Sequence, residues 1–118
     1  MGQYAAGAAD QAAQILAGSF TATGQSGAIA LYGPFSVAIW GAFAATLQLQ
    51  KSFDGGNTWI PYGADDSGVI PTLSAPTAFR VVESELGINY RLACTGFTSG
   101  MVNYRLSASA PRTSDTRN

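Results

Sequence analysis

A strand pattern that stops at a glycine pair and then resumes is the feature that most constrains the fold of this chain. Polar and apolar residues alternate over 45–51, and the strand pattern returns at 58–60. Between them lies Asp54, followed by Gly55 and Gly56. A carboxylate can accept hydrogen bonds from turn amides, and glycine adopts the positive φ that a tight turn needs. The sequence therefore predicts a β-hairpin whose turn is fixed by Asp54.

The residues of this turn match the Asp-box pattern S-x-D-x-G-x-T-W. They are Ser52, Asp54, Gly56, Thr58 and Trp59, with Gly55 as the second glycine. The pattern occurs once in the chain, and enzymes and extracellular proteins that carry it use it as a structural turn. We therefore expect these residues to shape a hairpin and not to perform chemistry.

The remainder of the central region reads as further short strands separated by turn signals. The expected strands are 19–23, 28–32, 35–40, 44–51, 58–62, 78–83, 88–94 and 101–107, with a short strand at 69–70 as an option within the 63–76 loop. Alternation predicts that three sets of residues face inward: Phe35, Val37 and Ile39; Tyr90, Leu92 and Cys94; and Val102, Tyr104 and Leu106. The last two strands are expected to form a second hairpin across residues 95–100. The prediction is an all-β fold, a small antiparallel β-sandwich or barrel.

The chain divides into three regions by composition. Residues 1–18 are Ala-rich and are expected to form an N-terminal arm, in which 5–16 is either helical or extended. Residues 19–110 form the predicted β domain. Residues 111–118 form a polar C-terminal tail without core-forming side chains.

Charged side chains are scarce. They make up 11% of the 118 residues, against about 25% in an ordinary soluble domain, and the net charge is −1. A small monomer needs a charged surface to stay dispersed, so we expect much of the surface to be covered by other subunits. No basic stripe is present, which argues against nucleic-acid binding. Because Gly33, Pro34 and Gly41 interrupt the best apolar stretch, no membrane span is expected, and nothing resembles a signal peptide, so we expect synthesis and assembly in a cytoplasm.

Catalytic and metal-binding chemistry finds little support. The chain has no histidine, which removes Ser-His catalysis and most zinc sites. The acidic residues are expected to be turn formers or solvated groups, and Asp65-Asp66-Ser67 lacks the ligand spacing of a calcium loop. Cys94 is the only cysteine and is expected to be a buried thiol. We predict no enzyme activity, no cofactor and no metal.

Aromatic residues offer one alternative, a carbohydrate-binding module. Trp40 and Trp59, together with Tyr32, Tyr62 and Phe43, could line a platform for sugar rings. The competing interpretation is that these side chains fill a small core or anchor a protein interface. The arginines 80, 91 and 105 are expected to pair with Glu83, Glu85 or backbone carbonyls at subunit contacts.

Several segments together resemble small structural proteins of tailed bacteriophages. They are LYGPFSVAIWG at 31–41, LQLQKSFDGGNTW at 47–59, ESELGINYRLACT at 83–95 and SGMVNYRLS at 99–107. The resemblance covers about residues 28–107. It implies a virion component, a capsid decoration (cement) protein that binds the major capsid protein, commonly as a homotrimer. It carries no catalytic residues.

The resemblance leaves head and tail positions open, so a tail or neck component (fibre, spike or adaptor) is the alternative within the virion. In either case the partners are other virion subunits and further copies of this chain. The residues expected to contribute to the interface are Tyr4, Leu16, Trp40, Phe43, Arg91 and Arg105.

Overall fold

The computed structural model describes residues 14–63 and 72–108, and within these ranges the fold consists of strands and connections without a helix. The strands are β1 (Gln14–Phe20), β2 (Gly24–Gln25), β3 (Ile29–Ala30), β4 (Gly33–Trp40), β5 (Phe43–Ser52), β6 (Ile60–Pro61), β7 (Thr77–Glu83), β8 (Asn89–Gly100) and β9 (Val102–Ala108). The all-β prediction is confirmed.

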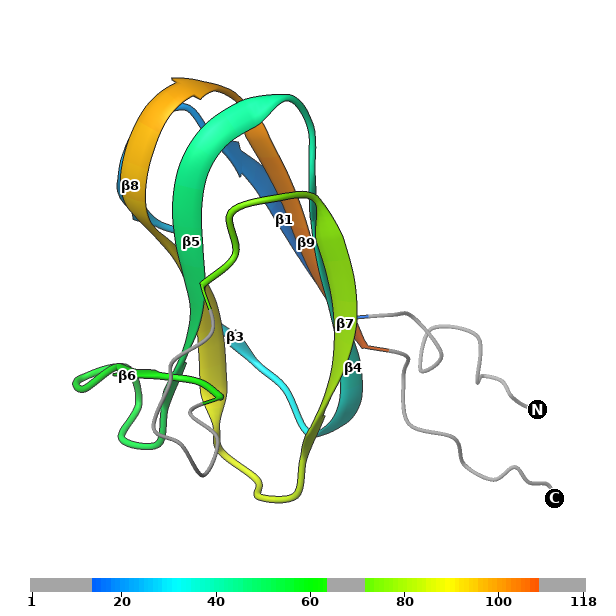
Figure 1. Cartoon of the computed structure of the whole chain (residues 1–118). Coiled ribbons are helices and arrows are strands. Elements are labelled where there is room, and N and C mark those ends of the chain that lie inside the picture. Colours follow the sequence, from blue (N-terminus) through cyan, green and yellow to red (C-terminus); the bar gives the residue numbers. More distant parts are fainter. Residues whose placement is uncertain (1–13, 64–71, 109–118) are drawn as a thin grey trace, which may run out of the picture.

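The strands form two antiparallel sheets that face each other as a sandwich (Figure 1). One sheet has the order β1-β9-β4-β7, and the other has the order β2-β8-β5-β6, with β3 also paired to β8. If β2 and β3 are taken as two halves of one interrupted strand, the chain visits the sheets in the order of a jelly roll. This all-β architecture of two four-stranded sheets is shared by viral capsid proteins, lectins and cupins.

The core lies between the sheets and is built by alternation. Phe35, Val37 and Ile39 of β4 are at most 2% exposed, as predicted. The second and third predicted sets are also buried. The rings of Phe35 and Tyr90 meet across the interior with their centroids 4.7 Å apart, so the two sheets contact each other through aromatic packing as well as through aliphatic side chains.

The predicted hairpin between the last two strands is wrong. Residues 95–100 continue β8 and pair with the first half of β5, and two register shifts in that pairing absorb the irregular backbone. The following strand, β9, lies in the other sheet between β1 and β4. Sequence alternation marks the buried faces correctly but does not show which sheet each strand joins, because both sheets bury the same kind of face.

Two glycines allow the chain to cross between the sheets twice at the same end. The crossings are β4 to β5, at Gly41, and β8 to β9, at Gly100, and a hydrogen bond of 3.2 Å from the Met101 amide to the Ala42 carbonyl joins them. Both glycines have positive φ, +122° and +89°. A side chain at Gly100 would collide with the Ala42 carbonyl, so the close approach of the two crossings requires glycine.

The predicted boundary of the N-terminal arm moves. Residues 14–18, assigned to the arm, belong to β1 and pair with β9 from Gln14↔Ala108 onward. Of the two options for 5–16, the extended one holds for residues 14–16, and the remainder of that segment lies outside the described residues, as do the option of a strand at 69–70 and the 111–118 tail. In the described ranges no helix is long and apolar enough to cross a membrane.

Candidate functional site

The Asp-box turn forms the tip of the β5–β6 hairpin and is held by side-chain hydrogen bonds. The Ser52 hydroxyl is fully buried; it donates to Asp54 Oδ1 over 2.8 Å and accepts from the Gly56 amide over 2.9 Å. Asp54 Oδ1 also accepts from the Thr58 amide over 2.9 Å. Gly55 and Gly56 have φ of +75° and +94°, as a turn of this kind requires. The predicted hairpin is confirmed, although β6 is only two residues long.

The Asp54 carboxylate is stabilised in its charged form. The hydrogen bond from the Thr58 amide, followed by those from the Thr58 hydroxyl and Ser52, holds the pKa of Asp54 below its ordinary value. These bonds exist only while the turn is formed, so Asp54 serves the conformation of the hairpin.

Trp59 follows the turn and lies on the outer face of the five-stranded sheet. Its ring stacks on the Arg91 guanidinium, whose central carbon is 4.3 Å from the ring centroid. Arg91 Nε donates to Gln50 Oε1 over 2.7 Å, and Gln50 Nε2 donates to Gln48 Oε1 over 2.7 Å. The sequence does not predict this cluster. It leads us to expect Arg91 to pair with an acidic residue or a backbone carbonyl.

A polar bridge joins the two sheets at the end of the sandwich that carries the Asp-box turn. Glu83 of β7 accepts hydrogen bonds from Lys51 Nζ over 2.8 Å, from the Tyr90 hydroxyl, and from the Glu85 amide over 3.1 Å. Glu83 and Lys51 form the only ion pair among the described residues. Within the chain Glu83 therefore pairs with a lysine, and the expected pairing of the arginines with Glu83, Glu85 or carbonyls at subunit contacts stays a prediction. Strand alternation gave a signal for this bridge, since Glu83 shares the inward parity of Val81, and Lys51 that of Leu49.

The contacts in this bridge shift the pKa values of Glu83 and Tyr90. Burial raises the pKa of Glu83, but the hydrogen bonds from Lys51, Tyr90 and the Glu85 amide, together with the charge of Lys51, outweigh burial and hold it below its ordinary value. Burial, and then Glu83 itself, raises the pKa of Tyr90 far above its ordinary value. Glu83 is thus ionised and Tyr90 neutral at physiological pH, the state in which the bridge is complete.

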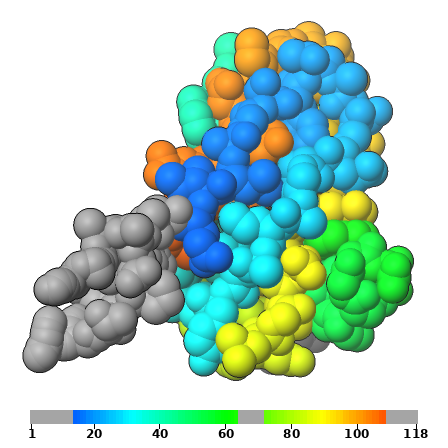
Figure 2. Space-filling model, turned by 180° about the vertical axis from the view of Figure 1, so that it is seen from behind, coloured from blue at the N-terminus to red at the C-terminus, as the bar shows by residue number. Residues whose placement is uncertain are grey.

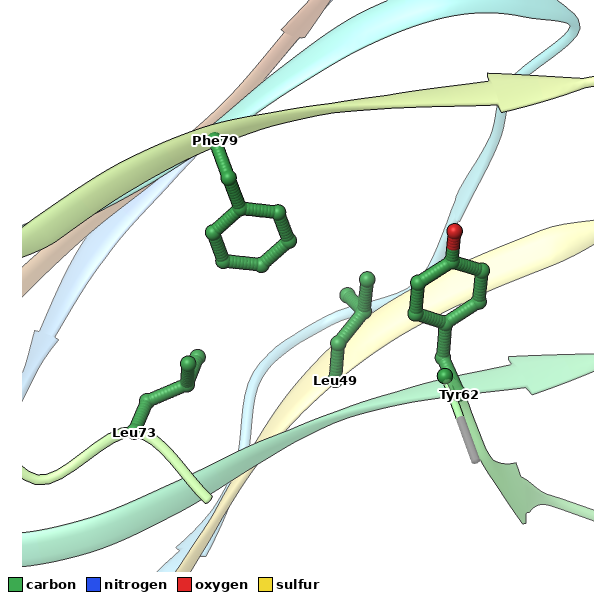
Figure 3. Close-up of a pocket in the computed structure, with 5 residues that line it drawn as sticks. Leu49, Tyr62, Leu73 and Phe79 are labelled. Atoms are coloured by element: carbon green, nitrogen blue, oxygen red, sulfur yellow. The ribbon is translucent and has the colours of Figure 1, made fainter. Parts of the chain in front are cut away.

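A cavity of about 360 Å³ opens between the sheets beside β6 and β7 (Figure 3). It is lined by Leu49, Tyr62, Gly63, Leu73 and Phe79. β6 is only two residues long, and Leu73 reaches this region through a bridge to Leu47. Among the described residues that line the cavity, Tyr62 carries the only polar side chain, and those of Leu49, Leu73 and Phe79 are apolar.

Among the described residues, eight large apolar side chains are exposed, and five of them lie at one end of the sandwich. These are Tyr32, Phe53, Ile60, Val82 and Leu86, which we call the apolar end. Strand register places them together: Gly33 pairs with Glu83, Ser52 with Asn89, and Lys51 with Ile60. Figure 2 shows the cyan segment that precedes β4 beside the yellow segment between β7 and β8 at this end. Leu86 is 74% exposed and Val82 is 62% exposed, so this end presents apolar surface to its surroundings.

The residues predicted to share an interface are not brought together as a set, although Trp40 and Arg105 are diagonal neighbours on the outer face of β4 and β9. Leu16 and Phe43 are partly buried against the core of their own chain. Trp40 is exposed at the end of β4, Arg105 is exposed on the outer face of β9, and Arg91 belongs to the Trp59 cluster. Tyr4 lies outside the described residues.

The predicted aromatic platform is also divided. Trp40 precedes the start of β5 and Trp59 follows its end, and the ten residues of that strand span about 30 Å at about 3.3 Å each. The two tryptophans therefore lie at opposite ends of the sandwich and cannot contact one sugar.

Cys94 is 3% exposed, as predicted, and burial raises the pKa of its thiol. Within residues 14–63 and 72–108, no group of three or more His, Cys, Asp or Glu side chains is placed to hold a metal ion.

Comparison with known proteins supports the fold and goes no further. No protein-family model matches the sequence, and no curated protein matches it. Among solved structures, the chain is similar to the Yersinia pseudotuberculosis-derived mitogen, with a TM-score of 0.50 and 15% identity over 92% of this chain and 91% of that one. The Drosophila melanogaster CENP-C cupin domain matches with a TM-score of 0.41 and 8% identity, over 80% of this chain and 59% of that one. At this identity the likeness to the mitogen is one of fold alone.

Proposed function

We propose that this chain is a structural subunit of a tailed-bacteriophage particle, a decoration protein that binds the lattice of the major capsid protein. The segments within residues 28–107 that resemble phage structural proteins support this proposal, and the jelly-roll architecture is one that viral capsid proteins share. In this role the protein binds the assembled shell more strongly than the separate shell subunits. Mass action then favours the intact particle.

The apolar end is the observation that carries the proposal. Exposed apolar side chains are normal when scattered, but their concentration at one end of a small domain is typical of a contact surface. Here they occur in a chain of which only 11% is charged. We assign this end to contact with the shell. Further copies of the chain, arranged as a homotrimer, complete the assembly.

A charge placed in the apolar end tests the assignment. Particles produced from the genome that encodes this chain are stripped of it and incubated with purified protein, and bound protein is measured by quantitative gel after sedimentation. Leu86→Lys is expected to reduce occupancy at least about tenfold, because a desolvated lysine without a partner costs more than about 1.4 kcal/mol. Ser99→Lys adds the same charge at the opposite end of β8, where the side chain is also exposed, and is expected to bind normally. Equal occupancy for Leu86→Lys and the unmodified protein would refute the assignment.

Imaging of labelled particles separates the decoration role from the tail or neck alternative. A decoration protein covers the shell in many copies, whereas a tail or neck component is confined to one site in few copies. Label restricted to the tail would transfer the proposal to that alternative.

The role of the N-terminal residues is tested by a deletion that respects the fold. Because β1 begins at Gln14, removing residues 1–18 would also remove most of an edge strand. Removal of residues 1–13 keeps every described strand. If these residues act as an arm, shell occupancy falls while the circular dichroism spectrum is unchanged, and unchanged occupancy contradicts the arm.

A further inference from the structure

The outer face of the five-stranded sheet carries an ordered polar cluster that the capsid role does not use. Gln50 and Arg91 are direct partners across β5 and β8, and Gln48 stands two residues along β5 on the same face. The two hydrogen bonds of 2.7 Å that link Arg91 to Gln50 and Gln50 to Gln48 fix the orientation of the guanidinium and both amides. The cluster is therefore organised before any ligand arrives.

The Asp-box turn supplies the aromatic member of this cluster. The Trp59 indole lies between the Arg91 guanidinium and Gly56, at which an added Cβ would be 3.7 Å from the ring. The Trp59 ring covers a flat face of the Arg91 guanidinium, and Gln50 accepts the hydrogen bond from Arg91 Nε. Among the described residues the terminal N–H groups of Arg91 donate to no acceptor, so the fork of the guanidinium remains able to bind an anion.

Ala93 lies beside Arg91 on the same outer face, beneath longer side chains. It is the next outward residue after Arg91 on β8, about 7 Å further along the strand, and it is flanked by its partners Gln48 and Gln25. Although alternation directs it outward, Ala93 is only 2% exposed, because longer neighbouring side chains cover it. The surface beside the guanidinium is therefore formed by amide-bearing side chains.

The charge of this sheet favours an acidic ligand. None of the strands β2, β3, β5, β6 and β8 contains Asp or Glu, and their only charged residues are Lys51 and Arg91. Lys51 is paired with Glu83 and directed to the inter-sheet bridge. Arg91 is left as the charge of the outer face in a protein whose net charge is −1.

From this arrangement we propose a binding site for a carboxylate-bearing saccharide on the outer face of β5 and β8. The sugar carboxylate pairs with the fork of Arg91, and the amides of Gln48 and Gln25 donate to and accept from the ring hydroxyls. The ring lies over the side chains that cover Ala93. The site is independent of the apolar end, so its failure would leave the capsid proposal untouched.

The test is an NMR titration of the ¹⁵N-labelled full chain with D-glucuronate, D-glucose and acetate. Glucuronate is expected to shift the Trp59 indole, the Arg91 Nε and the Gln48 amide signals, with a dissociation constant on the order of millimolar, as for a single small ligand on an open surface. Glucose, which lacks the carboxylate, and acetate, which lacks the ring, are each expected to bind at least about tenfold more weakly.

Variants locate the site. Arg91→Lys keeps the charge but loses the fork and should weaken glucuronate binding about tenfold, whereas Arg105→Lys, exposed on the other sheet, should have no effect. Gln48→Ala removes an amide without altering the Arg91–Trp59 stack and should also weaken binding, which covers the case of an unstable Arg91 variant. The proposal is overturned if glucuronate shifts none of these signals, if glucose or acetate binds as well, or if the site variants bind like the unmodified protein.

Discussion

Replacing Glu83 with glutamine should destabilise the protein in a way that depends on pH. Glu83→Gln keeps the size of the side chain and an oxygen acceptor but removes the charge that Lys51 and Tyr90 contact. The Glu83 side chain is 7% exposed and that of Lys51 is 25% exposed. In the variant, water therefore has little access to the side chain at position 83, whereas the Lys51 ammonium group can be partly rehydrated.

The expected loss follows from these exposures. Hydrogen bonds to a charged group contribute about 1.5–3 kcal/mol, and breaking a fully buried ion pair costs about 3–5 kcal/mol. Because Lys51 regains water, we expect about 2 kcal/mol. At about 4 °C per kcal/mol for a chain of this size, the melting temperature should fall by about 8 °C at pH 7.

The pH dependence gives the sharper test. The pKa of Glu83 is held below its ordinary value of 4.5, so the folded state favours the ionised form. Its contribution to stability is therefore present above pH 4.5 and is lost as the pH falls through the lowered folded-state pKa. Urea unfolding followed by circular dichroism at pH 7 and pH 3 should show a difference between the two proteins at pH 7 that shrinks at pH 3.

Glu85→Gln is the matched control, since Glu85 is exposed and only two residues away. It should leave stability within about 0.5 kcal/mol of the unmodified protein. The reasoning is refuted if Glu83→Gln is as stable as the unmodified protein at pH 7, or if its deficit is the same at pH 3.

Three further predictions concern the turn, the crossings and the thiol. Asp54→Asn should lower the protection of the Thr58 amide, the ratio of its intrinsic to its observed hydrogen-exchange rate at one pH, and acidification through the lowered pKa of Asp54 should lower the same ratio in the unmodified protein; an unchanged ratio contradicts the proposed turn. Gly100→Ala should cost about 3 kcal/mol in denaturant unfolding because strain adds to a backbone clash, while Gly87→Ala, at a similar positive φ with open space around it, should cost about 1 kcal/mol; equal losses would be inconsistent with the clash. Cys94 should react with a thiol reagent only after unfolding, because burial both shields the thiol and raises its pKa; rapid native-state labelling would show otherwise.

Local structure could be predicted from the sequence because it depends on residues that are close together in the chain. The parity of alternating residues identified the buried faces of β4, β8 and β9, and the Asp-box residues identified a turn from their own hydrogen-bonding chemistry. Both signals arise within a few residues of one another. They could be read without knowing which strands are neighbours.

The contacts between distant strands could not be read in the same way. β8 and β9 are consecutive and have matching patterns, yet they lie in different sheets, because Gly100 allows the chain to cross. The same limit applies to the candidate site. Arg91 lies 41 residues from its hydrogen-bond partner Gln50, so only the pairing of β5 with β8 brings the cluster together.

We propose that this jelly roll binds a viral shell through its apolar end, and a three-dimensional reconstruction of the particle would show whether it does. We predict a density of this shape on the outer surface of the head, with Leu86 and Val82 facing the capsid lattice and the outer face of β5 and β8 facing solvent. A head without such density, or with the apolar end turned away from the lattice, would contradict the account.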